Sequence, residues 1–359
     1  MNKITKQLQE LVKQTKQLAN NLLVKGRPVN ENMTLNELVP EVLNIASGDV
    51  KLGIKEITKD GTYYAYEDGV DGYSKVDVNI LGDNVDFLAT FTGTGSTIKH
   101  NVKMLGDVPA YAFYSMNKIN ELDLSNTKKV GERAFYNQTS LTNIIAPNKM
   151  TIDTFAFYGC GEATGTIKIA DDQTVVEERA FYGCKKLNFE LHDNITEVKQ
   201  YAFYNCQSNN LTKLPSKLKT IGQYAFYQNS GIDPLKITEI PPLVTNIGTY
   251  AFQSNSLETI KIYDACTSIS AYAFRYNSKL KSVEIGKGLK NMYAYTFANN
   301  TSLTTFTIHA TTPPTILGTT FQNSNKLAEI RVPASALETY KSASNWSVYA
   351  DLMVGIEGE

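Results

Sequence analysis

Apolar and polar positions alternate in a unit that repeats from about residue 108 to residue 331. One unit, residues 257–274, reads L-E-T-I-K-I-Y-D-A-C-T-S-I-S-A-Y-A-F. Ile260 and Ile262 alternate with polar residues, which predicts a short strand. A turn and a second apolar position, Ile269, follow, and Ala273 with Phe274 closes the unit at a tight bend or short helical turn. Each unit therefore directs several apolar residues toward one interior.

A phenylalanine ends each unit and returns ten times, at intervals of 22 to 26 residues. A period of this length is typical of stacked-repeat solenoids, in which one unit buries its apolar face only against its neighbours. The pattern predicts about ten stacked coils around a continuous ladder of phenylalanine rings. The ladder consists of Phe113, Phe135, Phe157, Phe181, Phe203, Phe226, Phe252, Phe274, Phe297 and Phe321.

The repeat also resembles a known family. The run Ile-Gly-x-Tyr-Ala-Phe-x-x-Asn-x-x-Leu-x-x-Ile-x-Ile, well preserved at residues 221–226 and 247–252, is similar to the BspA-like, or Treponema-type, leucine-rich repeat. The resemblance covers about residues 108–335. It implies an α/β leucine-rich-repeat solenoid of short strands and short helical turns over residues 108–331.

The end of the chain looks like the closing segment of such arrays. Residues 312–315, 332–340 and 345–350 carry this likeness, and the chain's single tryptophan, Trp346, lies in the last of them. A terminal cap needs a bulky apolar residue over the last coil. We therefore expect residues 332–359 to form the C-terminal cap, with Trp346 as a cap residue and not a ligand platform.

The N-terminal segment, residues 1–48, has the pattern of a helix with a heptad seam. One interpretation is an amphipathic helix that packs on its own domain, and the other is homo-oligomerisation, for which we prefer a parallel trimer. A capping box at residues 34–37 predicts a second helix. The seam residues are Ile4, Leu8, Leu11, Thr15, Leu18 and Leu22.

Two short modules lie between this segment and the repeats. Asp-Gly turns and the alternating Val76, Val78 and Ile80 predict a small β module at residues 49–82. Alternation of Phe87, Ala89 and Phe91 before a Gly-rich turn predicts a hairpin at residues 83–107 that caps the N-terminal end of the solenoid.

Residues 25–81 resemble segments of tail and fibre proteins of phages that infect Gram-positive bacteria. The motifs are Lys25-Gly26 with residues 33–38, and Ile57-Thr58-x-x-Gly61-Thr62-Tyr63 with residues 69–78. The likeness implies a virion structural protein, a fibre, tail or baseplate component that contacts other virion proteins. Its solenoid would face the host and bind a surface glycan or protein. The alternative is a bacterial cell-surface or secreted leucine-rich repeat adhesin, although residues 1–8 look too polar for a secretory signal.

Charge and composition argue against several other functions. The net charge is −1, from 35 basic and 36 acidic residues, and no basic patch stands out, so we expect no nucleic-acid binding. The sequence has no run of 18 apolar residues, so we expect no membrane insertion. The three histidines lie in different units and no nucleophile motif occurs. We therefore expect no enzyme, no bound cofactor and no metal site.

Three cysteines, Cys160, Cys184 and Cys206, each follow a repeat phenylalanine by three residues, where later units carry asparagine. The simplest interpretation is a ladder of small residues packed on the turn backbone. The alternative is a disulfide or a metal site, but the sequence lacks a C-x-x-C pair and the histidine spacing does not fit. Whether the three residues are free thiols stays open at this point.

The candidate binding surface is aromatic. The residue after the repeat phenylalanine is tyrosine in six consecutive units, and then the run stops. Tyrosine offers a flat apolar face and a hydroxyl, which suit a sugar ring or a protein partner. The alternative is that these residues only seal the edge of the phenylalanine ladder, but a purely structural tyrosine should persist through all ten units. The stripe consists of Tyr114, Tyr136, Tyr158, Tyr182, Tyr204 and Tyr227.

Overall fold

The structure, a computed structural model, describes residues 51–52, 61–65, 74–78, 87–92, 99–207, 210–230 and 235–358. The predicted N-terminal helices and all six heptad positions lie outside these residues, as does most of the segment that resembles phage proteins. Within the predicted β module, β2 (Gly61–Ala65) pairs antiparallel with β3 (Ser74–Val78).

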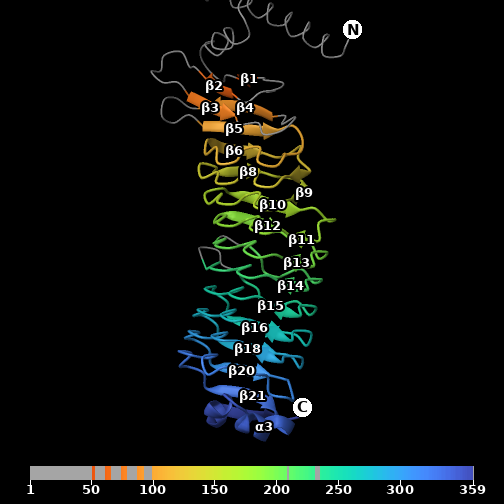
Figure 1. Cartoon of the computed structure of the whole chain (residues 1–359), viewed down its shortest axis with the longest axis vertical. Helices are drawn as coiled ribbons and strands as arrows, with labels where there is room; N and C mark the ends of the chain where they lie inside the picture. The colour runs from red at the N-terminus through yellow and green to blue at the C-terminus, as the bar shows by residue number, and fades with distance from the viewer. Residues whose placement is uncertain are drawn as a thin grey trace, which may run out of the picture.

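The repeat region begins at an antiparallel pair. Strand β4 (Phe87–Thr92) pairs antiparallel with both β1 (Lys51–Leu52) and β5 (Lys99–Met104). Strand β5 then pairs parallel with β6 (Ile119–Asp123), so the predicted hairpin continues directly into the first coil. Figure 1 shows the coils stacked from this end to the C-terminus in one elongated body.

The first side of the solenoid is a ladder of longer parallel strands, which we call the long-strand ladder. The ladder is made of three sheets. An isolated parallel bridge between Asn143 and Thr164 joins the first sheet to the second, and residues 210–214 and 235–238 cross without a strand between the second and the third. After β5 and β6 its members are β8 (Asn143–Ile145), β10 (Gly165–Ile169), β12 (Leu187–Glu190), β16 (Thr259–Ile262), β18 (Ser282–Ile285), β20 (Thr305–Ile308), β21 (Glu329–Pro333) and β22 (Met353–Ile356).

The second side is a ladder of mostly two-residue parallel strands, the short-strand ladder. In each strand the last residue points into the core and the one before it points outward, as the alternation in the sequence predicts. Its members are β7 (Lys129–Val130), β9 (Lys149–Ile152), β11 (Val175–Val176), β13 (Glu197–Val198), β14 (Thr220–Ile221), β15 (Asn246–Ile247), β17 (Ser268–Ile269) and β19 (Asn291–Met292).

The third side carries the Ala-Phe bends, and here the helical part of the predicted α/β class is wrong. Each bend is a hydrogen-bonded turn: Gln253 N donates to the oxygen of Tyr250 at 3.2 Å. Tyr250 and Ser254 have φ of 60° and 58°, so left-handed residues stand on both sides of Phe252 and a helix cannot propagate. In the described part of the chain, helices occur only in the C-terminal segment.

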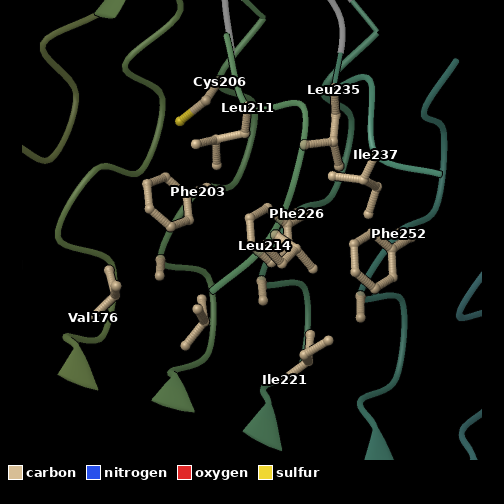
Figure 2. Packing of buried hydrophobic residues seen from close by; sticks show 14 of the residues in the cluster. Val176, Phe203, Cys206, Leu211, Leu214, Ile221, Phe226, Leu235, Ile237 and Phe252 are labelled. Atoms are coloured by element: carbon tan, nitrogen blue, oxygen red, sulfur yellow. The ribbon is translucent and has the colours of Figure 1, made fainter. Parts of the chain in front are cut away.

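The phenylalanine ladder forms the centre of the core, as predicted. All ten side chains are buried, and consecutive rings stack with centroids 5.2 to 6.2 Å apart. Figure 2 shows Phe203, Phe226 and Phe252 one coil apart, with Val176 and Ile221 of the short-strand ladder beside them. Leucines and isoleucines of successive coils surround the rings, so one apolar cluster runs through the array.

The segment expected to form the C-terminal cap follows the last phenylalanine of the ladder. It contains η2 (Ala334–Ala336), α3 (Leu337–Ser342) and η3 (Ser347–Leu352). Trp346 is 1% exposed, lies 6.3 Å from the ring of Phe321, and donates its indole N–H to the oxygen of Pro314 at 2.8 Å. The hydroxyl of Tyr340 donates to the oxygen of Ala310 at 2.8 Å. Trp346 therefore covers the last ring of the ladder.

From the second coil on, the side chain three residues after the phenylalanine forms a hydrogen bond with the backbone of the preceding coil. Cys184 Sγ lies 3.1 Å from the oxygen of Phe157, and Asn277 Nδ2 lies 2.9 Å from the oxygen of Phe252. Cysteine and asparagine thus serve one purpose, which supports the structural interpretation of the cysteines. All four are buried free thiols, and burial raises the pKa of Cys160 to about 12 and that of Cys266 to about 11.

Replacing Cys184 by alanine is expected to lower the free energy of unfolding by about 1–3 kcal/mol, because the oxygen of Phe157 loses its thiol donor. Serine is close to alanine in volume but keeps a hydrogen-bond donor. We therefore expect Cys184→Ser to lower the free energy of unfolding less than Cys184→Ala does. Urea denaturation of the full chain measures both. Equal losses for serine and alanine would show that the hydrogen bond contributes nothing.

Candidate recognition surface

The predicted tyrosine stripe is a continuous stack of rings, which we call the outer column. Adjacent rings lie nearly parallel with centroids 4.4 to 4.8 Å apart along the whole run. Tyr114, at the N-terminal end, is 45% exposed, and the other five are half-buried. The structure therefore brings all six predicted residues together on one face.

A second column runs beside the first, formed by the residue two positions before each of the first nine phenylalanines of the ladder. All nine members have φ between 51° and 63°, although none is glycine. We call it the left-handed column. Neighbouring tyrosines in it stack at 4.5 to 5.1 Å. Its members are Tyr111, Arg133, Phe155, Arg179, Tyr201, Tyr224, Tyr250, Tyr272 and Tyr295.

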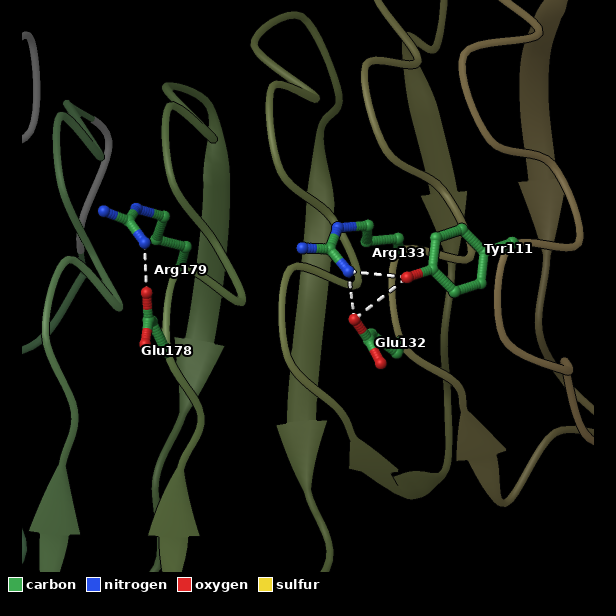
Figure 3. Close-up of polar contacts among 5 residues, drawn as sticks. All are labelled: Tyr111, Glu132, Arg133, Glu178 and Arg179. Carbon is green, nitrogen blue, oxygen red and sulfur yellow. Dashed lines mark hydrogen bonds and ion pairs between the residues drawn. The ribbon is translucent and has the colours of Figure 1, made fainter.

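Two arginines take the place of rings in the left-handed column. The guanidinium carbon of Arg133 lies 4.4 Å from the ring centroid of Phe155, and that of Arg179 lies 4.4 Å from the ring centroid of Tyr201. Each arginine also forms an ion pair with the glutamate that precedes it, as Figure 3 shows. The planar guanidinium group thus continues the stack while its charge is balanced nearby.

The two columns touch and form one aromatic face along the array. The ring of Tyr201 lies 5.8 Å from that of Tyr204, and Tyr224 lies 5.4 Å from Tyr227. The outer column ends at Tyr227, but aromatic stacking continues past this point in the left-handed column, whose members from residue 201 to residue 295 are all tyrosine. The argument that a structural tyrosine should persist through all units therefore loses force, since aromatic stacking does persist.

The stacking also changes what the face offers to a ligand. Rings 4.4 to 4.8 Å apart cover each other's flat faces, so a sugar ring cannot lie flat on the middle of the outer column as the sequence suggested. What remains available is a row of ring edges and hydroxyls. Burial raises the pKa of Tyr204 and Tyr224 to about 12. These phenols therefore stay neutral hydrogen-bond donors at physiological pH.

A shallow depression of about 350 Å³ lies on the outward side of the long-strand ladder, over β16, β18, β20 and β21. Hydroxyls of Thr259, Ser282 and Thr305 line it. Its charged groups are already paired: Lys261 with Glu284 at 2.7 Å, and Arg331 with Glu329 at 2.9 Å. The depression is thus a second candidate surface, but its charges are already neutralised.

The remaining polar residues of interest take part in local pairs. His192 Nε2 lies 2.7 Å from the oxygen of Ala170, and His309 Nε2 lies 3.4 Å from a carboxylate oxygen of Glu284. The three histidines belong to different coils, as expected from their spacing. Across the described ranges, none of the helices has the length and apolar composition needed to cross a membrane.

Comparisons with known proteins agree with this architecture. The family model described as BspA type leucine-rich repeat region, with 6 copies, matches residues 106–233, 151–276 and 230–347. None of the curated protein sequences matches the chain significantly.

Three solved structures are similar. A leucine-rich cell surface protein from Faecalibacterium prausnitzii is 22% identical, with 75% of this chain and 86% of that chain covered and a TM-score of 0.37. A leucine-rich repeat protein from Bacteroides ovatus is 17% identical, with 70% and 71% covered and a TM-score of 0.46. One from Eubacterium ventriosum is 17% identical, with 70% and 77% covered and a TM-score of 0.35.

Proposed function

Because the chain belongs to the BspA-type leucine-rich repeat family, we propose that it is a non-enzymatic recognition protein whose aromatic face binds a partner at a bacterial cell surface. The observation that carries the proposal is the outer column, in which six tyrosine rings stack with their centroids 4.4 to 4.8 Å apart and hold one another in place. Side chains that are already immobilised lose little rotamer entropy on binding. Tyrosine also combines apolar contact area with a hydrogen-bonding group.

We place the proposed function at the bacterial cell surface, the alternative given in the sequence analysis, and not on a phage particle. The family match covers the repeats, which make up most of the described chain. The likeness to phage tail and fibre proteins rests on residues 25–81, of which the structure describes only the short strands β1, β2 and β3. A fibre on a phage particle is therefore the second hypothesis for the function of this protein. It would gain support if the chain were found in purified phage particles and not on the surface of the producing cells.

The N-terminal segment is proposed to assemble the protein into a homo-trimer through the heptad seam of residues 4–22. Light scattering of the full chain at tens of micromolar tests this. We expect three times the chain mass of 39.8 kDa, and a lower mass after Leu11→Glu. A monomer at that concentration would exclude the proposed assembly.

The aromatic face is tested by removing hydroxyls without removing rings. We expect the triple variant Tyr158→Phe, Tyr182→Phe and Tyr204→Phe to keep its fold, because phenylalanine preserves the stack. It should bind intact bacterial cells and a glycan array more weakly, since each lost hydrogen bond contributes about 0.5–1.5 kcal/mol.

The matched control lies on the depression of the long-strand ladder. Ser282→Ala with Thr305→Ala removes two hydroxyls from that surface and leaves the aromatic face intact. We expect this control to bind like the unmodified chain. Weaker binding by the control, with unchanged binding by the tyrosine variant, would move the recognition surface to the depression and reject the proposal.

A further inference from the structure

The aromatic face contains one arginine in a different setting from the others. Arg275 occupies the outer-column position two units after Tyr227. Its guanidinium carbon lies 5.3 Å from the ring centroid of Tyr272, 4.4 Å from that of Tyr276 and 5.4 Å from that of Tyr295. Its Nη2 donates to the hydroxyl of Tyr276 at 3.1 Å, at an exposed position. Three aromatic rings thus hold a cation at the surface.

Arg275 differs from the other described arginines in its counter-charge. Those three each pair with a glutamate: Arg133 with Glu132, Arg179 with Glu178 and Arg331 with Glu329. Among the described residues, no carboxylate forms an ion pair with Arg275, and its buried Nε has no acceptor. The buried Nε is not accessible to a ligand, but the exposed Nη end of this guanidinium group has no carboxylate to neutralise it in the described part of the chain and is suited to bind an anion from outside.

The surrounding turns reinforce this difference. The four turn segments around Arg275, residues 246–257, 268–280, 291–303 and 315–327, contain no aspartate or glutamate, but they contain Lys279 and Lys326. Glu258, directly after the first segment, forms an ion pair with Lys281 at 2.9 Å. The corresponding turns nearer the N-terminus carry Glu132, Asp153 and Glu178. The aromatic face is therefore neutralised in its first half and positive around Arg275, which favours an anionic ligand there.

Tyr276 gives the site a second recognition element. Its side chain is 46% exposed, and its φ of 59° places it in the left-handed position after Phe274. The equivalent residues of the adjacent coils are Ser254 and Asn299, which have no rings, and no ring stacks on Tyr276 within the described part. Unlike the rings of the outer column, this ring has one flat face covered by Arg275 and no second ring to cover the other.

We propose that Arg275 and Tyr276 form a subsite for an acidic sugar, an inference that rests on the proposed role of the aromatic face. The guanidinium group binds the carboxylate of one sugar unit, and the apolar face of a neighbouring pyranose unit packs on the open face of Tyr276. Ser254 and Asn299 lie on either side as hydrogen-bonding partners for sugar hydroxyls. A carboxylate and a pyranose ring together satisfy both elements, whereas an acidic peptide side chain satisfies only the first.

Calorimetric titration of the full chain tests the subsite. The probes are a linear trimer of galacturonic acid and the neutral galactose trimer of the same linkage. We expect binding of the acidic trimer, and at least tenfold weaker binding of the neutral one. Arg275→Gln and Arg275→Lys should each weaken binding of the acidic trimer at least tenfold, because neither offers a charged bidentate fork. Tyr276→Ser should weaken it as well.

The control is Arg331→Gln, which removes a paired arginine from the long-strand ladder and should leave the affinity unchanged. Thermal melting of each variant establishes that the fold is retained. Failure of the unmodified chain to bind the acidic trimer, or equal binding by Arg275→Gln, would overturn the subsite. Binding of poly-glutamate as tight as that of the sugar would overturn the assignment to a sugar.

The two proposals fail separately. If Arg275→Gln abolishes binding of the acidic trimer while the outer-column variant still binds cells normally, the subsite stands and the role of the tyrosine hydroxyls is rejected. If the outer-column variant loses cell binding while Arg275→Gln binds the trimer like the unmodified chain, the subsite is rejected and the aromatic face stands.

Discussion

Phe252→Ala is expected to lower the free energy of unfolding by about 3–5 kcal/mol, the range for removing a fully buried aromatic side chain. The ring is 0% exposed and stacks on both neighbours, 5.3 Å from Phe226 and 5.3 Å from Phe274. Because each coil is stabilised only by its neighbours, a cavity at this position weakens two interfaces at once. Chemical denaturation followed by far-ultraviolet circular dichroism measures the loss.

Phe155→Ala is the matched control, since the same substitution is made at a half-buried ring of the left-handed column. Its ring lies between Arg133 and Arg179 on the surface, so we expect a loss of about 1 kcal/mol. Similar losses at the two positions would contradict the central role of the ladder. A second transition in the Phe252→Ala variant would indicate that the array has separated into two folding units.

Trp346→Ala is expected to destabilise the C-terminal coils by about 3–5 kcal/mol and to leave the N-terminal coils nearly unchanged. The indole covers Phe321 and Phe306, with ring centroids 6.3 and 6.5 Å away, and its N–H satisfies the oxygen of Pro314. Without it, the last coil exposes apolar surface and frays. Hydrogen exchange resolves the effect along the chain, because local opening appears as faster exchange only where it occurs.

Val348→Ala provides the control for this cap. Val348 lies in the same segment but is 73% exposed, so its truncation should change exchange little. A uniform rise of exchange along the entire solenoid after Trp346→Ala would show that the array unfolds as a single unit. No rise at all would show that Trp346 does not serve as a cap.

The repeat and its core could be predicted from sequence because both depend on periodicity. The spacing of the phenylalanines, the alternation at Ile260 and Ile262, and the single Trp346 each place an apolar side chain where the structure buries it. The Asn and Gly residues two positions after the phenylalanine, such as Asn205 and Gly183, also signal a left-handed turn. Read in that way, they would have argued against a helix at the bend.

The left-handed column could not be predicted in the same way. Tyrosine, arginine and phenylalanine rarely adopt positive φ, and nothing local identifies the position of Tyr250 or Arg179 as left-handed. The conformation is imposed by hydrogen bonds between coils: Tyr250 N donates to the oxygen of Ala271 at 3.1 Å. The sequence showed which tyrosines share a stripe but not that stacking covers their faces. It also did not distinguish Arg275 from the arginines that are paired with glutamate.

The measurement that tests the central claim most directly is the dissociation constant for intact bacterial cells, compared between the unmodified chain and the Tyr158→Phe, Tyr182→Phe, Tyr204→Phe variant. Three lost hydrogen bonds of about 0.5–1.5 kcal/mol each predict binding about tenfold weaker or more, with an unchanged melting temperature. Equal dissociation constants for two folded proteins would contradict recognition through the hydroxyls of the outer column.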